Sequence, residues 1–183
     1  MYNFKLKQMK KLILSVAAVF AFGFANAQDK TDNGGQTAKG KWLIEANTGF
    51  GAAHSADTAF GLSSVDGETA WSIGAEGGYF VMDDLAIKAG LGYNDMGDDM
   101  TAFSYKVGAK YYILSQIPVQ VDYSGASYKD ADENPSYVGI QGGYAIFLGP
   151  NVSIEPGLRF NKSLNDDFYE DVFQVRIGFA LHF

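Results

Sequence analysis

The sequence contains no cysteine and only two histidines, so several kinds of site are excluded at once. Without cysteine the chain can form neither a disulfide framework nor a thiolate metal site. His54 and His182 stand near opposite ends of the chain, and no HExxH motif surrounds either. Walker and GxGxxG loops are also absent. We therefore expect no metal site and no cofactor.

Basic residues are scarce beyond the N-terminus. Lys5, Lys7, Lys10 and Lys11 are four of the 14 basic residues, and no acid accompanies them. Without this segment, 10 basic residues face 21 acidic ones, a net charge of -11. Nucleic-acid binding needs clustered Lys and Arg for phosphate contacts, so we do not expect nucleic acid as a partner.

The N-terminal segment has the features of an export signal. Lys10 and Lys11 precede an apolar run over 12–24, and Ala25-Asn26-Ala27-Gln28 follows. This pattern predicts a signal peptide over 1–27, cleaved between Ala27 and Gln28. A membrane anchor or buried helix is the alternative, but 13 apolar residues fall short of the roughly 20 that span a bilayer. Translation beginning at Met1 or at Met9 would fit equally.

Residues 28–40 are polar and predict a flexible lead-in, and from residue 41 the hydrophobicity alternates with period 2, as in β-strands. The pattern is clearest at the C-terminus, where one face carries only apolar residues: Phe173, Val175, Ile177, Phe179, Leu181 and Phe183. Eight such segments begin near residues 42, 71, 85, 103, 119, 138, 152 and 173. Most reach the roughly 9–11 residues of a tilted transmembrane strand.

The connections between these segments alternate in length. Short turns are expected at 82–84, 115–118 and 149–151, and longer loops near 54–69, 95–101, 129–136 and 162–169. Outer-membrane barrels have short periplasmic turns and longer external loops. The sequence thus predicts an all-β, eight-stranded antiparallel up-and-down transmembrane barrel over 41–183. A soluble β-sandwich or lipocalin-like barrel is the alternative, but it would bury the apolar face.

The second face of the strands is small and polar, with isolated charges. Projected into a barrel, it places four acids and five bases in the lumen: Glu45, Glu76, Asp122, Glu155, Lys88, Lys106, Lys110, Arg159 and Arg176. Unpaired charges in a confined space are costly, so we expect a network of ion pairs. By strand order, the acids nearest to Arg176 are Glu45 and Glu155. The network either fills the lumen permanently or forms part of a gated channel.

Residues 41–183 resemble the small outer-membrane β-barrel superfamily that includes the OmpA transmembrane domain and OmpX. The signal sequence followed by Gln28, and the final strand ending in Phe183, are similar to porin-family members of the Bacteroidetes type. The resemblance implies a place in the bacterial outer membrane, among lipid and lipopolysaccharide. It also implies that the alternating residues 173–183 are the signal read by the β-barrel assembly machinery.

This reading predicts a non-enzymatic protein with a structural or surface-interaction role and leaves any external partner open. A narrow porin or gated small-solute channel is the second interpretation. A lipid-modifying enzyme is the third, but its candidate pair, His54 and Ser55, consists of sequence neighbours that would point to opposite faces of a strand. The acidic loops are either simply solvated or bridged by divalent cations to lipopolysaccharide.

Overall fold

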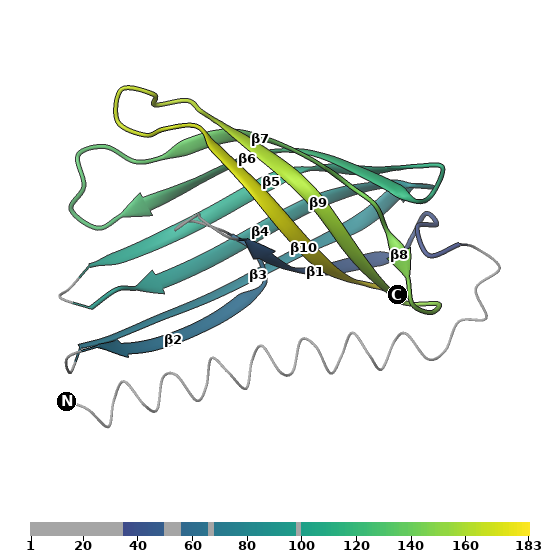
Figure 1. Ribbon diagram of the computed structural model, residues 1–183, viewed down its shortest axis with the longest axis horizontal. Coiled ribbons are helices and arrows are strands. Elements are labelled where there is room, and N and C mark those ends of the chain that lie inside the picture. Colours follow the sequence, from purple (N-terminus) through teal and green to yellow (C-terminus); the bar gives the residue numbers. More distant parts are fainter. Residues whose placement is uncertain (1–34, 50–55, 66–67, 98–99) are drawn as a thin grey trace. The chain divides into compact units, whose positions relative to one another are not determined.

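The strands of the protein form an antiparallel sheet that curls until its two ends meet (Figure 1). The computed structural model describes residues 35–49, 56–65, 68–97 and 100–183. The predicted signal peptide with its cleavage site and the pair His54–Ser55 lie outside these residues. Within them, no helix has the length and apolar character needed to cross a membrane.

Eight strand positions make up the wall of the barrel. The strands are β1 (Trp42–Gly49), β2 (Ala59–Val65), β3 (Glu68–Met82), β4 (Leu85–Asp95), β5 (Thr101–Ile113), β6 (Ile117–Tyr128), β7 (Ser136–Gly143), β8 (Ile146–Phe147), β9 (Val152–Ser163) and β10 (Val172–His182). β1 and β2 run one after the other along β3, as β7 and β8 do along β9. The predicted eight-stranded antiparallel barrel is therefore confirmed.

The first and last strands close the barrel. β1 pairs with β10 from Leu43↔His182 to Gly49↔Arg176, and with β3 from Trp42↔Tyr79 to Glu45↔Glu76. An open sheet edge would leave backbone N–H and C=O groups without partners, which is very costly in hydrocarbon. The closed ladder removes that cost over the part of the wall where β1 lies.

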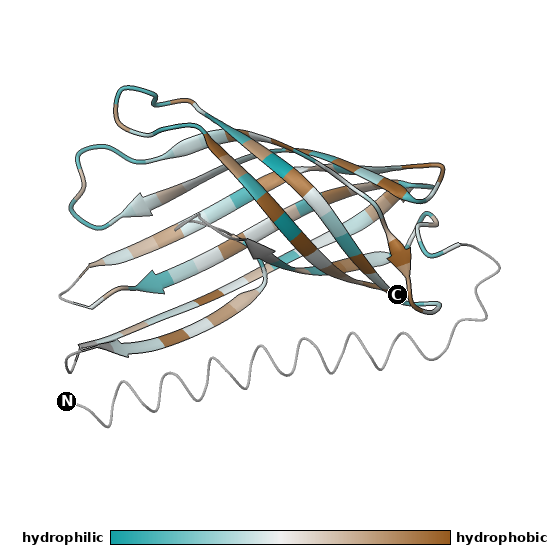
Figure 2. Ribbon diagram, in the orientation of Figure 1, coloured by the Kyte–Doolittle hydropathy of each residue, from teal (hydrophilic) through white to brown (hydrophobic). Residues whose placement is uncertain are grey.

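The side chains alternate between the two faces of the wall. In β10, Phe173, Val175 and Ile177 are exposed on the outside, whereas Gln174 and Arg176 are buried inside. Figure 2 shows the same alternation as brown and teal bands along β9 and β10. The period-2 pattern of the sequence is thus the pattern of outward and inward positions.

Two expectations about strand boundaries were wrong. The predicted loop at 54–69 contains β2, where Phe60 and Leu62 continue the alternation and extend the hairpin with β3. The strand expected to run from Val138 to Leu148 is interrupted after Gly143. Pro156 on the neighbouring β9 has no N–H to donate to the ladder there, and the chain of β7 resumes only as the short β8.

Residues 36–40, which belong to the predicted lead-in, are hydrogen-bonded to the turn between β3 and β4. The Thr37 hydroxyl donates to Asp84 Oδ1 at 2.5 Å, and the Asp84 N–H donates to the Thr37 carbonyl at 2.8 Å. The Lys39 N–H donates to Asp83 Oδ1 at 2.8 Å. Thr37 is only 3% exposed, so this segment is part of the short-turn end of the barrel.

Asp84, in the turn between β3 and β4, also contacts the turn between β5 and β6. Its second carboxylate oxygen accepts a hydrogen bond from the Ser115 hydroxyl at 3.2 Å. Asp84→Ala removes both side-chain bonds and should lower the free energy of unfolding by about 1–3 kcal/mol, measured by urea titration in liposomes. Asp83→Ala, which removes only the exposed bond to Lys39, is the control and should cost less. Equal losses in the two variants would contradict this role of Asp84.

Candidate functional site

The interior of the barrel is lined by buried charged residues. All nine predicted lumen residues are at most 5% exposed: Glu45, Glu76, Lys88, Lys106, Lys110, Asp122, Glu155, Arg159 and Arg176. They come from β1, β3, β4, β5, β6, β9 and β10, so nearly every part of the wall contributes. Together with other buried polar residues, they form one connected set of ion pairs and hydrogen bonds.

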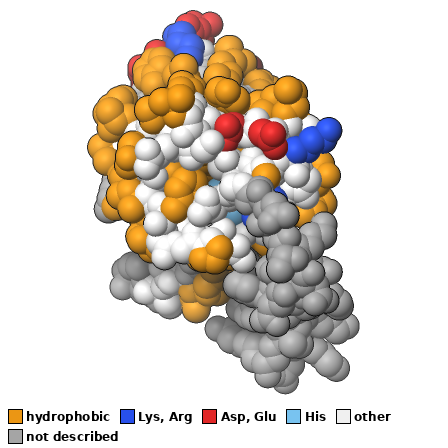
Figure 3. Space-filling view, turned by 90° about the vertical axis from the view of Figure 1, so that its right-hand side faces the viewer, with side chains coloured by type: hydrophobic (Ala, Val, Ile, Leu, Met, Phe, Trp, Pro, Cys, Tyr) orange, Lys and Arg blue, Asp and Glu red, His pale blue; other side chains and the backbone are white. Residues whose placement is uncertain are grey.

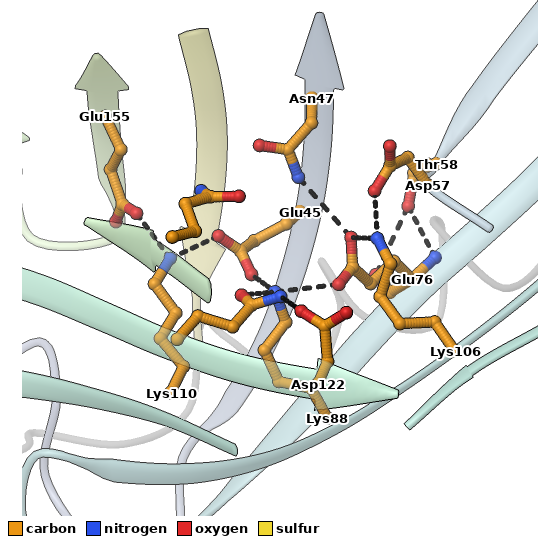
Figure 4. Close-up of polar contacts among 12 residues, drawn as sticks. Glu45, Asn47, Asp57, Thr58, Glu76, Lys88, Lys106, Lys110, Asp122 and Glu155 are labelled. Carbon is orange, nitrogen blue, oxygen red and sulfur yellow. Dashed lines mark hydrogen bonds and ion pairs between the residues drawn. The ribbon is translucent and has the colours of Figure 1, made fainter. Parts of the chain in front are cut away.

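Lys110 of β5 lies between two carboxylates. Its Nζ is paired with Glu45 of β1 and with Glu155 of β9, and Figure 4 shows it between them. The Tyr112 hydroxyl and the Ser153 hydroxyl each donate to Glu155 Oε1 at 2.9 Å. Glu155 is thus fully supplied with donors, as a buried carboxylate must be.

Lys88 of β4 continues the chain of pairs. Its Nζ contacts Glu45, lies 2.8 Å from Glu76 Oε1 and donates to Gln120 Oε1 at 2.7 Å. Glu45 therefore joins Lys88 to Lys110. The alternation of cation and anion extends without a break from Glu155 to Glu76.

Asp122 of β6 and Arg159 of β9 form a bidentate pair, which Gln120 links to Lys88. Arg159 Nη1 and Nη2 donate to the two carboxylate oxygens of Asp122 at 2.7 and 2.6 Å. Gln120 Nε2 also donates to Asp122 Oδ2 at 2.7 Å. Bidentate pairs of this kind fix the orientation of both groups as well as neutralising them.

One acid of the network was missed by the sequence analysis. Asp57, which precedes β2, is 1% exposed and is paired with both Lys106 and Arg176. The expectation that Arg176 faces Glu45 or Glu155 was therefore wrong. The sequence did contain a signal, because the predicted lumen set had one base too many, and Asp57 adds the fifth acid to that set.

Aromatic side chains fill the lumen at the short-turn end. His182 is fully buried, with ring centroids 5.6 Å from Phe147 and 6.1 Å from both Phe80 and Tyr112. Its Nε2 lies 3.1 Å from the Ser153 hydroxyl. His182 therefore lies inside the lumen, packed among these rings.

The outer surface of the barrel is apolar and carries aromatic pairs towards both ends. Trp42 and Tyr79 lie 5.1 Å apart near the short turns, and Trp71 and Tyr93 lie 5.4 Å apart nearer the long loops. Viewed from the short-turn end, hydrophobic side chains gather around the periphery (Figure 3). Belts of aromatic residues at two levels are typical of barrels whose ends meet the two membrane interfaces.

The long loops carry exposed acids. Among the residues that the structure describes, no three Asp, Glu or His side chains are grouped to hold a metal ion. Two loops are instead joined through Glu133, which accepts hydrogen bonds at 2.9 Å from Asn165 and Tyr169. The Ser163 N–H donates to Asp171 at 2.9 Å and holds the pKa of that carboxyl below its usual range.

No protein-family model and no curated protein matches this chain. Among solved structures, it is similar to the N-terminal β-barrel domain of Pseudomonas aeruginosa OprF, with 15% identity, 79% of this chain and 98% of that chain covered, and a TM-score of 0.48. The outer membrane protein OprG of the same organism has 10% identity, 82% and 99% coverage and a TM-score of 0.46. The outer membrane protein Ail of Yersinia pestis has 13% identity, 79% of this chain and 100% of that chain covered, and a TM-score of 0.45. The likeness lies in the course of the strands and does not extend to function.

Removing a buried cation should be far more damaging than removing an exposed one. Lys110→Met leaves Glu45 and Glu155 without their shared partner and should lower the free energy of unfolding by about 3–5 kcal/mol. Lys162→Met removes ion pairs of a side chain that is 52% exposed and should cost less than about 1 kcal/mol. Urea unfolding of both variants in liposomes measures the difference, and similar losses would show that the network does not hold the barrel together.

Proposed function

We propose that this protein is an outer-membrane β-barrel with a structural or surface-interaction role, its lumen filled by paired charges. The observation that carries the proposal is the polarity of the wall. Outward residues are apolar and exposed, such as Leu91 (58%), Val107 (54%) and Phe173 (63%), while inward residues are charged and buried. A belt of this extent on a water-soluble protein would be a large aggregation-prone patch, whereas in hydrocarbon it is required.

The interior supports the same proposal. A soluble β-barrel buries apolar residues inside and presents polar ones to water. In this barrel the middle of the interior is occupied by ion pairs, and the apolar layer is confined to one end. That distribution suits a protein whose outer surface contacts lipid and whose interior is polar.

The proposal includes the route and the partners. A signal peptide over 1–27 would bring the chain to the periplasm, and the assembly machinery would read the alternating residues of β10 and the terminal Phe183. Outer-membrane lipid and lipopolysaccharide would then surround the apolar belt. The same last strand suggests that the chain belongs to the OmpA/OmpX-like, porin-family group of the Bacteroidetes type.

A narrow channel is the second candidate. One observation favours it, namely that part of the filling of the lumen, Ala56–Thr58, comes from a connecting segment and not from the wall. We propose no catalytic role. Ser153 and His182 are in contact, but both are fully buried, so a substrate could not reach them.

The experiment that tests the proposal is fractionation of cells that express the full chain, combined with gel electrophoresis of boiled and unboiled samples. We expect the protein in the outer-membrane fraction, with faster migration before boiling because the closed barrel stays compact. Recovery from the soluble periplasm, with no change in migration on boiling, would overturn the proposal.

Charge on the lipid face should be costly. Val107→Arg or Ile177→Arg places a guanidinium on the outside of the wall and should lower the free energy of unfolding in liposomes by about 2–4 kcal/mol. Arg at Asp132, an exposed loop position, is the matched control and should change little. If all three variants unfold alike, the outside of the barrel does not face hydrocarbon.

A further inference from the structure

Ala56–Thr58 forms a segment inside the barrel that is not part of the wall, and we call it the inner segment. Ala56 is 2% exposed and Asp57 is 1% exposed. Their backbone carbonyls lie against Gly90 of β4 and Gly74 of β3, where an added Cβ would stand 2.2 Å from each carbonyl oxygen. Two inward positions without side chains thus form the seat of the inner segment.

The carboxylate of Asp57 connects the inner segment to two strands of the wall. Lys106 of β5 contacts Asp57 Oδ1, and Arg176 of β10 contacts Oδ2. In the closed ring of eight positions, β5 and β10 lie four strands apart in either direction, so they face each other. One planar carboxylate therefore joins opposite walls of the barrel.

The two cations have few other partners. Arg176 Nε has no hydrogen-bond partner among the described residues, and Nη1 reaches Gln141 only at 3.4 Å. Lys106 lies 3.4 Å from Glu76, further than from Asp57. Next to Asp57, Thr58 fastens the inner segment to β3, because the Glu76 N–H donates a hydrogen bond to the Thr58 hydroxyl at 2.7 Å.

We propose that Lys106 and Arg176 form a carboxylate-binding site, that the inner segment plugs the lumen by placing Asp57 in this site, and that the lumen passes small anions once the plug is displaced. The site takes a small monocarboxylate, since its two donors contact the two oxygens of a single carboxylate. With Asp57 removed, the buried bases outnumber the buried acids, so the open lumen attracts anions and repels cations. The passage leads across a membrane only if the proposed function holds.

The first experiment displaces the plug in two ways, by Gly90→Ala without changing any charge and by Asp57→Asn with loss of the carboxylate. Gly90→Ala puts a methyl group where the Ala56 carbonyl lies, so the inner segment must move. In planar bilayers we expect the wild type to be closed, and both Gly90→Ala and Asp57→Asn to conduct with a reversal potential that favours anions. Gly142→Ala, at a glycine with no atom within 4 Å of an added Cβ, is the control and should stay closed.

The second experiment tests the site itself and needs no bilayer. Asp57→Ala removes one carboxylate group, and formate is the molecule that replaces it. Formate should raise the thermal unfolding midpoint of Asp57→Ala in detergent, whereas formamide, which has the same shape without the charge, should not. The wild type, whose site is occupied by Asp57, should not respond to formate.

The outcomes separate this inference from the proposed function. Variants that insert but remain closed, or that conduct without preferring anions, overturn the inference and leave the outer-membrane barrel intact. Equal responses of wild type and Asp57→Ala to formate overturn it as well. A wild-type protein that does not enter bilayers at all counts against the proposed function, and formate rescue still decides whether the carboxylate site exists.

Discussion

A buried ammonium group held between carboxylates is the interaction on which the interior of this barrel depends. Lys110 and Lys88 each contact two acids, and Glu45 is shared between them. Taking such charges out of water costs several kcal/mol for each ion, and only close pairing with further hydrogen bonds compensates. The neighbouring hydroxyls and amides, such as Tyr112 and Gln120, supply those further bonds. The strands of the wall must therefore hold these charged side chains within ion-pairing distance of one another.

The barrel solves two solvation problems with one sheet. Period 2 sends each second side chain to the outer surface and each other one to the lumen, so one strand carries both requirements. β10 is the clearest case, with Phe173, Val175 and Ile177 outside and Gln174 and Arg176 inside. At the short-turn end the rule is relaxed, because Phe80, Tyr112 and His182 fill the lumen with rings instead of charges.

The strands were predictable from sequence because periodicity is a local property, and so was the burial of inward residues such as Glu45, Lys110 and Arg159. The partners of these residues were less predictable. Arg176 was expected to face acids on neighbouring strands, but a long side chain in a narrow barrel reaches across the lumen, and it pairs with Asp57. Asp57 itself lies in a connection, where no alternation marks the side chains that turn inward. Its recruitment depends on Gly74 of β3 and Gly90 of β4, which form one seat only when these strands pair.

The acids of the network come from strands near both ends of the chain. The buried lysines are therefore fully neutralised only when those strands have come together. Glu45 lies on the first strand and Glu155 on the last but one, whereas Lys88 and Lys110 lie on central strands. A growing sheet that lacks either end holds central lysines without their full complement of acids, and such an intermediate is poorly suited to leave water. Only the meeting of β1 with β10 brings the acids of both ends to the same lysines. If the barrel is inserted in a membrane as proposed, this uncompensated charge would hold an incomplete barrel in water, and closure and entry into the membrane would be one cooperative event.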